Sequence, residues 1–215
     1  MKRTRIKICG LTRPEDAAVA VSSGADALGV VLAPSKRQVT LDQAAAVFAH
    51  VPPLVARVGV FRDARADKVW EAVARLGLTA VQFHGDEAPE TCAAAPVPVI
   101  KTVGVGPDTL LGDLDAYHGS VAALLLDTVV GGQSGGTGVA FDWYDVAGRL
   151  PRWAPVIVAG GLGPSNVSEA VRSLAPFAVD VCSGVEASAG VKDHALIESF
   201  CAAVRAADLE VSDVR

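Results

Sequence analysis

Short runs rich in Val, Ile and Leu recur along the whole chain, and segments with helical periodicity separate them. This alternation is typical of repeated strand–helix units around a parallel sheet. It predicts eight strands, near residues 5–9, 26–32, 54–60, 79–83, 97–103, 121–127, 155–159 and 178–182. It also predicts helices near residues 14–23, 41–50, 65–76, 88–94, 107–117, 141–149, 165–174 and 192–207.

Eight such units favour a closed barrel over an open doubly wound sheet, which shows the same alternation. Local signals support the helix ends. Thr40 and the pair Ser165 and Asn166 suit capping of the helices that follow them, and Gly24 and Gly77 stand just beyond helical runs. We therefore predict a single-domain α/β protein, a (β/α)8 TIM barrel over residues 1–208, with residues 209–215 as a frayed tail.

The composition of the chain agrees with this fold and excludes some classes of partner. A chain of 215 residues and 22.0 kDa can bury one large core. Its net charge of -5 and pI near 5.3 argue against nucleic acid or a membrane surface as the main partner. The mean hydropathy is +0.37, yet the sequence has no transmembrane run and no signal-peptide pattern. Its four cysteines are scattered, which favours a reducing compartment, and we expect a cytoplasmic protein.

Cys9 is the first candidate for chemistry. Strand alternation puts Ile6 and Ile8 on one face and Lys7 and Cys9 on the other. Cys9 would then end the first strand, at the end of a barrel where catalytic groups collect. An arbitrary free cysteine is more often a small buried hydrophobe. A nearby ammonium would favour the thiolate, the form that accepts a proton.

Asp127 is the second candidate, because it directly follows the apolar run at 122–126. A carboxylate buried alone is costly, so this one must reach solvent, a partner or a ligand. The alternative is a loop aspartate that caps neighbouring backbone. In a ring of eight strands, Cys9 and Asp127 would face one cavity from different sides, which suits a base and an acid acting on different atoms of one substrate.

Other segments suggest how a ligand could be bound. The stretches AGGLG at 159–163 and SGVE at 183–186 follow the last two predicted strands, where barrels often hold phosphate on backbone N–H groups that glycine lets a ligand approach. Arg37 could clamp a substrate carboxylate, or belong to a solvated basic loop. A lone histidine such as His84 is more often a hydrogen-bonded structural residue, and since it has no second ligand at metal-like spacing we assign no metal. The composition of the stretch 131–138 is typical of a mobile loop over the site or of a flexible surface connector.

A set of motifs carries a resemblance to a known family. In order along the chain they are KICGLT at 7–12, SKRQV at 35–39, VGVF at 58–61, VQFHG at 81–85, LLD at 125–127, GGTG at 135–138, FDW at 141–143, AGGL at 159–162, NV at 166–167 and VDVCSGVE at 179–186. Together these motifs resemble phosphoribosylanthranilate isomerase, an enzyme of tryptophan biosynthesis. The chain departs from the usual family pattern at GVVL, residues 29–32, and at Cys182, where serine is common.

The resemblance implies a (β/α)8 barrel that converts N-(5-phosphoribosyl)anthranilate to 1-(2-carboxyphenylamino)-1-deoxyribulose 5-phosphate by an Amadori rearrangement, without a cofactor. It implies that Asp127 is the general acid that opens the ribose ring and that Cys9 is the general base. Arg37 would hold the anthranilate carboxylate. The other substrate-binding residues would be Lys7, His84, Gly136, Gly160, Gly161, Asp180, Ser183 and Gly184. The expected partner is this small phosphosugar, bound by a monomer or a homodimer.

Two other interpretations stay open at this point. One is another phosphosugar isomerase barrel, similar to aminoimidazole-carboxamide ribotide isomerase, although acid and base there are typically both aspartates. The other is a barrel that binds a phosphate ligand without catalysis. The presence of both Cys9 and Asp127 counts against the second interpretation.

Overall fold

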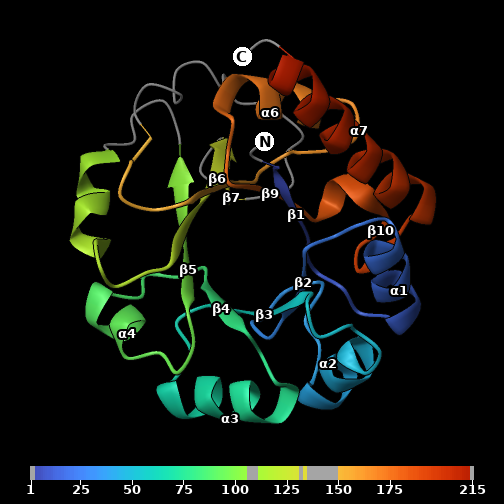
Figure 1. Ribbon diagram of the computed structural model, residues 1–215. Helices are drawn as coiled ribbons and strands as arrows, with labels where there is room; N and C mark the ends of the chain where they lie inside the picture. Colours follow the sequence, from blue (N-terminus) through green and yellow to red (C-terminus); the bar gives the residue numbers. More distant parts are fainter. Residues whose placement is uncertain (1–2, 106–110, 131–132, 135–149, 214–215) are drawn as a thin grey trace.

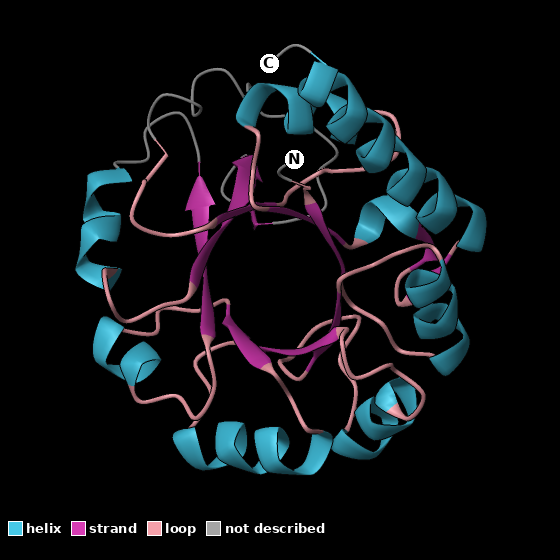
Figure 2. Cartoon of the chain, in the orientation of Figure 1, coloured by secondary structure: helices cyan, strands magenta, loops and turns pink. Residues whose placement is uncertain are grey.

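The computed structural model describes residues 3–105, 111–130, 133–134 and 150–213. Eight parallel strands form a closed ring, seen end-on in Figures 1 and 2. They are β1 (Arg5–Ile8), β2 (Ala27–Val31), β3 (Ala56–Phe61), β4 (Ala80–Phe83), β5 (Val99–Val105), β6 (Ala123–Val130), β8 (Val156–Val158) and β9 (Ala178–Val181). Each lies where the sequence predicts a strand, and the predicted TIM barrel is confirmed.

The ring follows chain order and closes between its first and last strands. In β1, Lys7 is paired with Asp180 of β9 and with Ala27 of β2. The circuit continues through β5, β6 and β8 back to β9, with every neighbouring pair of these strands parallel. A short strand, β7 (Gln133–Ser134), runs antiparallel to the end of β6, and β10 (Glu186–Ser188) pairs with β11 (Val191–Lys192) beyond β9.

Helices surround the ring (Figure 2). They are α1 (Pro14–Ser22), α2 (Leu41–Phe48), α3 (Ala66–Leu76), α4 (Pro89–Ala93), α6 (Val167–Leu174), α7 (His194–Asp213) and the 3-10 helices η1 (Leu111–Tyr117) and η2 (Ser183–Val185). The helix expected at 107–117 is a 3-10 helix over its described part, because glycine and aspartates make its sequence, LGDLDAY, a weak α-helix former. The helix expected at 141–149 lies outside the described residues.

The end of the chain differs slightly from the prediction. Helix α7 continues to Asp213 instead of ending near residue 207. That the segment 209–215 frays stays a prediction, as does the domain boundary at residue 208. Among the described helices, none is long and apolar enough to cross a membrane.

The predicted helix caps are confirmed at one helix start and two helix ends, and corrected at another start. Thr40 and Gln43 form a reciprocal capping box at α2. Gly77 ends α3 in the left-handed conformation, and Gly24 follows α1 with φ +92°. At α6 the N-cap is Asn166, but its side chain does not cap the helix. It bonds instead to the loop that precedes the helix.

Strand alternation divides the buried side chains into two sets. Ile6 and Ile8 have no exposed surface and belong to the large apolar core that also contains Phe200 of α7. A second, smaller cluster fills the inside of the ring with residues such as Leu125 and Ile157. Lys7 and Cys9 lie on the opposite face of β1 from the two isoleucines, as predicted. The interior of the ring therefore carries both small apolar residues and polar groups.

Candidate active site

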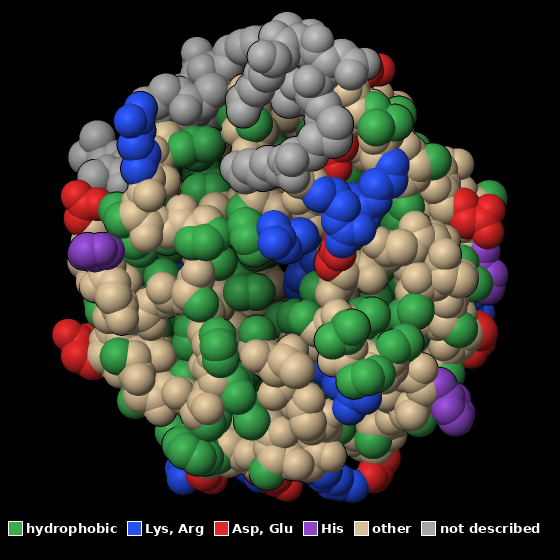
Figure 3. Space-filling model, viewed as in Figure 1, with side chains coloured by type: hydrophobic (Ala, Val, Ile, Leu, Met, Phe, Trp, Pro, Cys, Tyr) green, Lys and Arg blue, Asp and Glu red, His purple; other side chains and the backbone are tan. Residues whose placement is uncertain are grey.

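A pocket of about 290 Å³ opens at the carboxyl ends of the strands. In the space-filling view, Lys and Arg side chains gather near the middle of the face (Figure 3). The pocket is lined by side chains from most strands of the ring and from the segments that follow them, including Cys9, Ser35, Arg37, Val60, Arg62, Gln82, His84, Leu125, Asp127, Gly160, Gly161, Asp180, Cys182 and Ser183. This is the end of a TIM barrel at which active sites lie.

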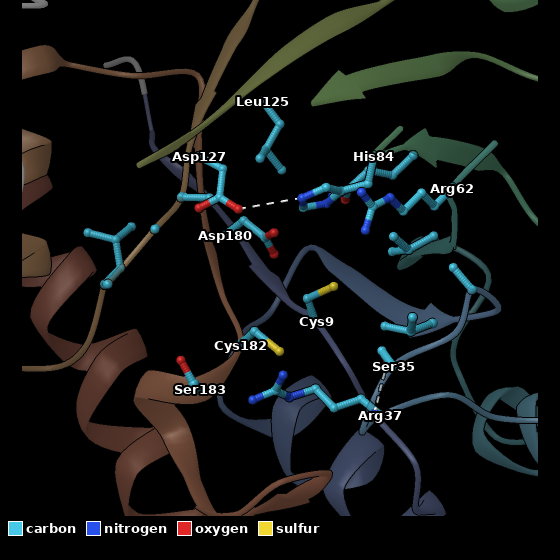
Figure 4. A pocket seen from close by; sticks show the side chains of 18 of the residues that line it. Cys9, Ser35, Arg37, Arg62, His84, Leu125, Asp127, Asp180, Cys182 and Ser183 are labelled. Carbon is cyan, nitrogen blue, oxygen red and sulfur yellow. Dashed lines mark hydrogen bonds and ion pairs between the residues drawn. The ribbon is translucent and has the colours of Figure 1, made fainter. Parts of the chain in front are cut away.

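Cys9 and Asp127 face this pocket from different sides, as the sequence predicts (Figure 4). Cys9 follows β1 and is 6% exposed, while Asp127 lies on β6 and is 7% exposed. Gly29 of β2 leaves room for the thiol, because a Cβ atom at Gly29 would lie 2.8 Å from the Cys9 sulfur. The two groups are thus buried enough to act in a low-dielectric site and open enough to meet a ligand.

The Cys9 thiol has a pKa above its ordinary value, because burial disfavours the thiolate. The Lys7 ammonium acts in the opposite direction, but it forms a buried ion pair with Asp180, Nζ to Oδ1 2.8 Å, and the Asp180 charge raises the pKa of Cys9 again. Lys7 therefore favours the thiolate, as expected, but burial and Asp180 outweigh it. Lys7 itself stays charged, since Asp180 and Cys9 hold its pKa above the ordinary value against the effect of burial.

His84 follows β4 and lies beside Asp127, with Nε2 3.6 Å from Oδ2 (Figure 4). Burial lowers the pKa of His84 below its ordinary value, and the nearby Asp180 carboxylate only partly offsets this. The imidazole is therefore neutral at pH 7. It presents a polar, uncharged neighbour to the carboxyl group.

Arg37 lines the pocket, but most of its planar fork is occupied. Its Nε and Nη2 atoms donate to the two carboxylate oxygens of Glu186, each at 2.7 Å. Lys192 Nζ donates to the same carboxylate at 2.9 Å and to the carbonyl of Cys182 at 2.9 Å. Glu186 lies in a motif that we singled out, yet no sequence signal linked it to Arg37. The open two-pronged clamp that the sequence suggested is therefore absent, and Nη1 is the terminal nitrogen left for a ligand.

Burial alone would raise the pKa of Glu186, but its hydrogen bonds to Arg37 and Lys192 bring the pKa below the ordinary value. Gly10 makes room for this network. It has φ +69°, and a Cβ atom there would lie 2.7 Å from both Arg37 Cδ and the Cys182 sulfur. The glycine after Cys9 is thus required by conformation and by close packing.

The two glycine-rich segments predicted to hold phosphate lie against each other. A Cβ atom on Gly184 would lie 1.9 Å from the carbonyl oxygen of Leu162. Asn166 fixes the first segment, since its Oδ1 accepts from Gly163 N at 2.8 Å and its Nδ2 donates to Gly161 O at 2.9 Å. Gly160 and Gly161 have φ values of 83° and 64° and line the pocket together with Ser183. Gly184 packs against Leu162 and Gly163 of the first segment and is not among the residues that line the pocket.

Two polar residues that received no role from the sequence line the pocket, and one predicted residue lies outside the described part of the chain. Gln82 of β4 and Arg62, which follows β3, both line the pocket. A signal for Gln82 existed, because a polar residue stands within the apolar run at 79–83. Gly136 lies outside the described residues. Within the described ranges, no three His, Cys, Asp or Glu side chains gather in a way that could hold a metal ion.

Comparison with known proteins gives a consistent result. The family model "N-(5'phosphoribosyl)anthranilate (PRA) isomerase" matches residues 6–203. The N-(5'-phosphoribosyl)anthranilate isomerase of Myxococcus xanthus is 48% identical over 208 residues, which covers 95% of this chain and 98% of that protein. The corresponding protein of Pseudomonas fluorescens (strain Pf0-1) is 47% identical over 207 residues, covering 95% of this chain and all (100%) of that protein.

Solved structures agree with the sequence comparison. Phosphoribosyl anthranilate isomerase from Thermotoga maritima superposes with a TM-score of 0.88 at 39% identity, covering 94% of this chain and 99% of that one. A phosphoribosyl anthranilate isomerase in complex with reduced 1-(o-carboxyphenylamino)-1-deoxyribulose 5-phosphate superposes with a TM-score of 0.85 at 38% identity, with the same coverage.

Proposed function

The chain belongs to the phosphoribosylanthranilate isomerase family, and from this premise we propose that Asp127 and Cys9 are the acid and the base of its reaction. The protein is an isomerase of tryptophan biosynthesis that rearranges N-(5-phosphoribosyl)anthranilate to 1-(2-carboxyphenylamino)-1-deoxyribulose 5-phosphate. The observation that carries the assignment is that these two side chains face one pocket from β1 and β6. The other isomerase and the non-catalytic barrel are not favoured, given the family match.

The first step opens the ribose ring. Asp127 donates a proton to the ring oxygen while the bond from that oxygen to C1 breaks, and the lone pair of the amine nitrogen forms a C=N bond. The result is a protonated Schiff base. A general acid within reach of the leaving oxygen contributes about 10²- to 10⁴-fold to such a step.

The second step moves a proton away from carbon. The Cys9 thiolate takes the proton from C2, and the electron pair of that C–H bond forms the C1–C2 double bond of an enolamine while the C=N bond returns its pair to nitrogen. Tautomerisation then gives the ketone. No electrons enter or leave overall, so these two groups supply the proton transfers that the rearrangement needs.

Lys7 and Asp180 set how easily Cys9 becomes a base. Burial and Asp180 favour the thiol, whereas Lys7 favours the thiolate. The Lys7–Asp180 pair is itself buried and hydrogen-bonded at 2.8 Å, so the charge beside Cys9 is fixed in position. We propose that both residues serve to position and tune the base, in addition to any contact that they make with substrate.

The two anionic ends of the substrate match different parts of the pocket. The phosphate is assigned to the segments after β8 and β9, where Gly160 and Gly161 let a ligand approach the backbone. The carboxylate is assigned to the side of Arg37, because Nε and Nη2 of Arg37 donate to Glu186 and Nη1 does not. Arg62 adds a further guanidinium to the pocket wall. His84 and Ser183 complete the proposed contacts.

This assignment is tested with freshly generated phosphoribosylanthranilate, whose anthranilate-type fluorescence falls as the isomerase consumes it. We expect rapid loss with the wild type and a kcat reduced by about 10²- to 10⁴-fold in Asp127→Asn and in Cys9→Ala. Cys182→Ser is the matched control, because it changes the neighbouring pocket thiol and should keep kcat within about threefold. A variant of Asp127 or Cys9 with the wild-type rate would reject that residue's role.

The partner, the assembly and the location follow from the same proposal. The partner is this small phosphosugar, and the net charge of -5 disfavours nucleic acid and membranes. Among related structures, one is described as monomers generated from a dimeric phosphoribosylanthranilate isomerase of Thermotoga maritima. A monomer or homodimer in the cytoplasm stays our expectation for this chain.

A further inference from the structure

Gln82 has a hydrogen-bonding group that the folded protein leaves unused. Its side chain projects from β4 into the ring, lines the pocket and is only 2% exposed. Nε2 donates to Thr102 Oγ1 on β5 at 3.1 Å. Oε1 is buried and has no hydrogen-bond partner, a state shared among the described side chains only by Ser173 Oγ.

A buried acceptor without a donor costs free energy, so such an atom in a folded protein needs an explanation. Thr102 holds the amide by its nitrogen, which leaves the carbonyl oxygen as the unpaired end. Ser173 lies on α6, away from the residues that line the pocket, whereas Gln82 lies in the pocket wall. Of the two residues, only Gln82 lines the pocket that a ligand would enter.

The substrate offers such donors only in its middle. Its phosphate and carboxylate oxygens accept hydrogen bonds, while its ribose hydroxyls and amine N–H donate. Gln82 precedes His84 by two positions on the same face of β4, and His84 lies 3.6 Å from Asp127. Gln82 thus lies one layer deeper in the ring than His84 and its neighbouring acid, and the donor assigned to it is therefore on the sugar, the part of the substrate on which that acid acts.

We propose that Gln82 is a substrate-binding residue whose Oε1 accepts a hydrogen bond from a ribose hydroxyl that keeps its proton throughout the reaction, the 3-hydroxyl. A neutral amide cannot remove a proton, so it suits a hydroxyl that is held and not one that reacts. This proposal rests on the isomerase function above. It makes Gln82 a determinant of specificity, because a site with an unpaired acceptor discriminates against sugars that lack the matching hydroxyl.

The test compares Gln82→Met, which keeps the length of the side chain and removes both polar atoms, with the wild type. Loss of one neutral hydrogen bond should raise KM about 2- to 12-fold. The Kd of the product analogue, reduced 1-(o-carboxyphenylamino)-1-deoxyribulose 5-phosphate, should rise by a similar factor. The kcat should change by less than about threefold, because a contact made equally in ground and transition states affects binding alone.

Three further variants separate binding from folding. Gln82→Asn keeps the amide but withdraws it by one methylene, and it should raise KM even if Gln82→Met folds poorly. The pair Gln82→Met with Thr102→Val removes both partners of the internal hydrogen bond, so it should keep or raise the Tm of the free protein while KM stays high. Ser173→Ala is the matched control, since it removes the other unpaired buried atom and should leave KM and kcat unchanged.

Unchanged KM and unchanged analogue Kd in both Gln82 variants, with the wild type active, would overturn the proposal and leave Gln82 a structural role. A fall in kcat with KM unchanged would also overturn it, since it would show a contact made only in the transition state. Absence of turnover in the wild type is a different result, because it would refute the isomerase assignment itself.

Discussion

Gly184→Ala should disturb the proposed phosphate site by a severe contact with the backbone of the facing segment. The new Cβ atom would lie 1.9 Å from Leu162 O and 2.9 Å from the carbon of the same carbonyl. Real Cβ contacts essentially never fall below 3.0 Å, so the segments after β8 and β9 must separate by about 1 Å. These are backbone atoms, and no side chain can rotate away to relieve the contact.

Overpacking of this kind costs about 1–3 kcal/mol, which for a chain of this size lowers Tm by roughly 2–12 °C. A displacement of about 1 Å in a substrate-binding segment can lower kcat/KM by about 10²-fold. Because the shift falls on the proposed phosphate site, we expect most of the loss in KM. Differential scanning fluorimetry and the fluorescence assay measure the two effects separately.

Gly163→Ala is the matched control for this experiment. It lies on the facing segment, but its Cβ would meet Gly184 O at 3.5 Å, an ordinary contact. Its Tm and KM should stay close to those of the wild type. If Gly184→Ala behaved like Gly163→Ala in both measurements, the close packing of these segments and its link to phosphate binding would be refuted.

Two further predictions follow from the charged groups. Burial raises the pKa of the Cys9 thiol above its ordinary value, so the rate at which a thiol reagent alkylates Cys9 in the free enzyme, measured against Cys9→Ala, should still be rising above pH 9; a plateau from pH 7 would exclude a raised pKa. The pKa of Glu186 is lower in the folded than in the unfolded protein, despite burial. Its carboxylate therefore stabilises the fold at pH values above the unfolded pKa, and this stabilisation is lost as the pH falls through the folded pKa. Glu186→Gln should therefore cost about 3 kcal/mol at pH 7, measured by urea unfolding, with the difference from wild type shrinking below pH 4.

The barrel could be predicted because each strand–helix unit carries its own periodicity. Alternation at residues 6–9 correctly assigns Ile6 to the outer core and Lys7 to the interior. Local chemistry also located the Thr40 cap. The failures are equally local: glycine and aspartate turned the segment at 111–117 into a 3-10 helix, and Asn166 used its side chain to hold a loop.

The site was predictable in its residues and less so in its charges. Position at a strand end was sufficient to bring Cys9 and Asp127 into one pocket. Position alone could not show that two nitrogens of Arg37 donate to Glu186, because these residues are far apart in sequence and meet only when the ring closes. Gln82 received no predicted role, because the apolar run at 79–83 was interpreted only as a buried strand.

Ring closure between β1 and β9 also decides the chemistry of the base. Lys7 and Asp180 are direct partners in the register of these strands, and the amide of Cys9 donates to Val181 O at 2.9 Å. The carboxylate that neutralises Lys7 is thus delivered by the same pairing that positions the thiol. The neighbouring strand supplies a charge that the local sequence KIC cannot reveal. The prediction for Cys9 considered only the Lys7 ammonium. In the folded protein, burial, Lys7 and Asp180 together set the pKa of the Cys9 thiol.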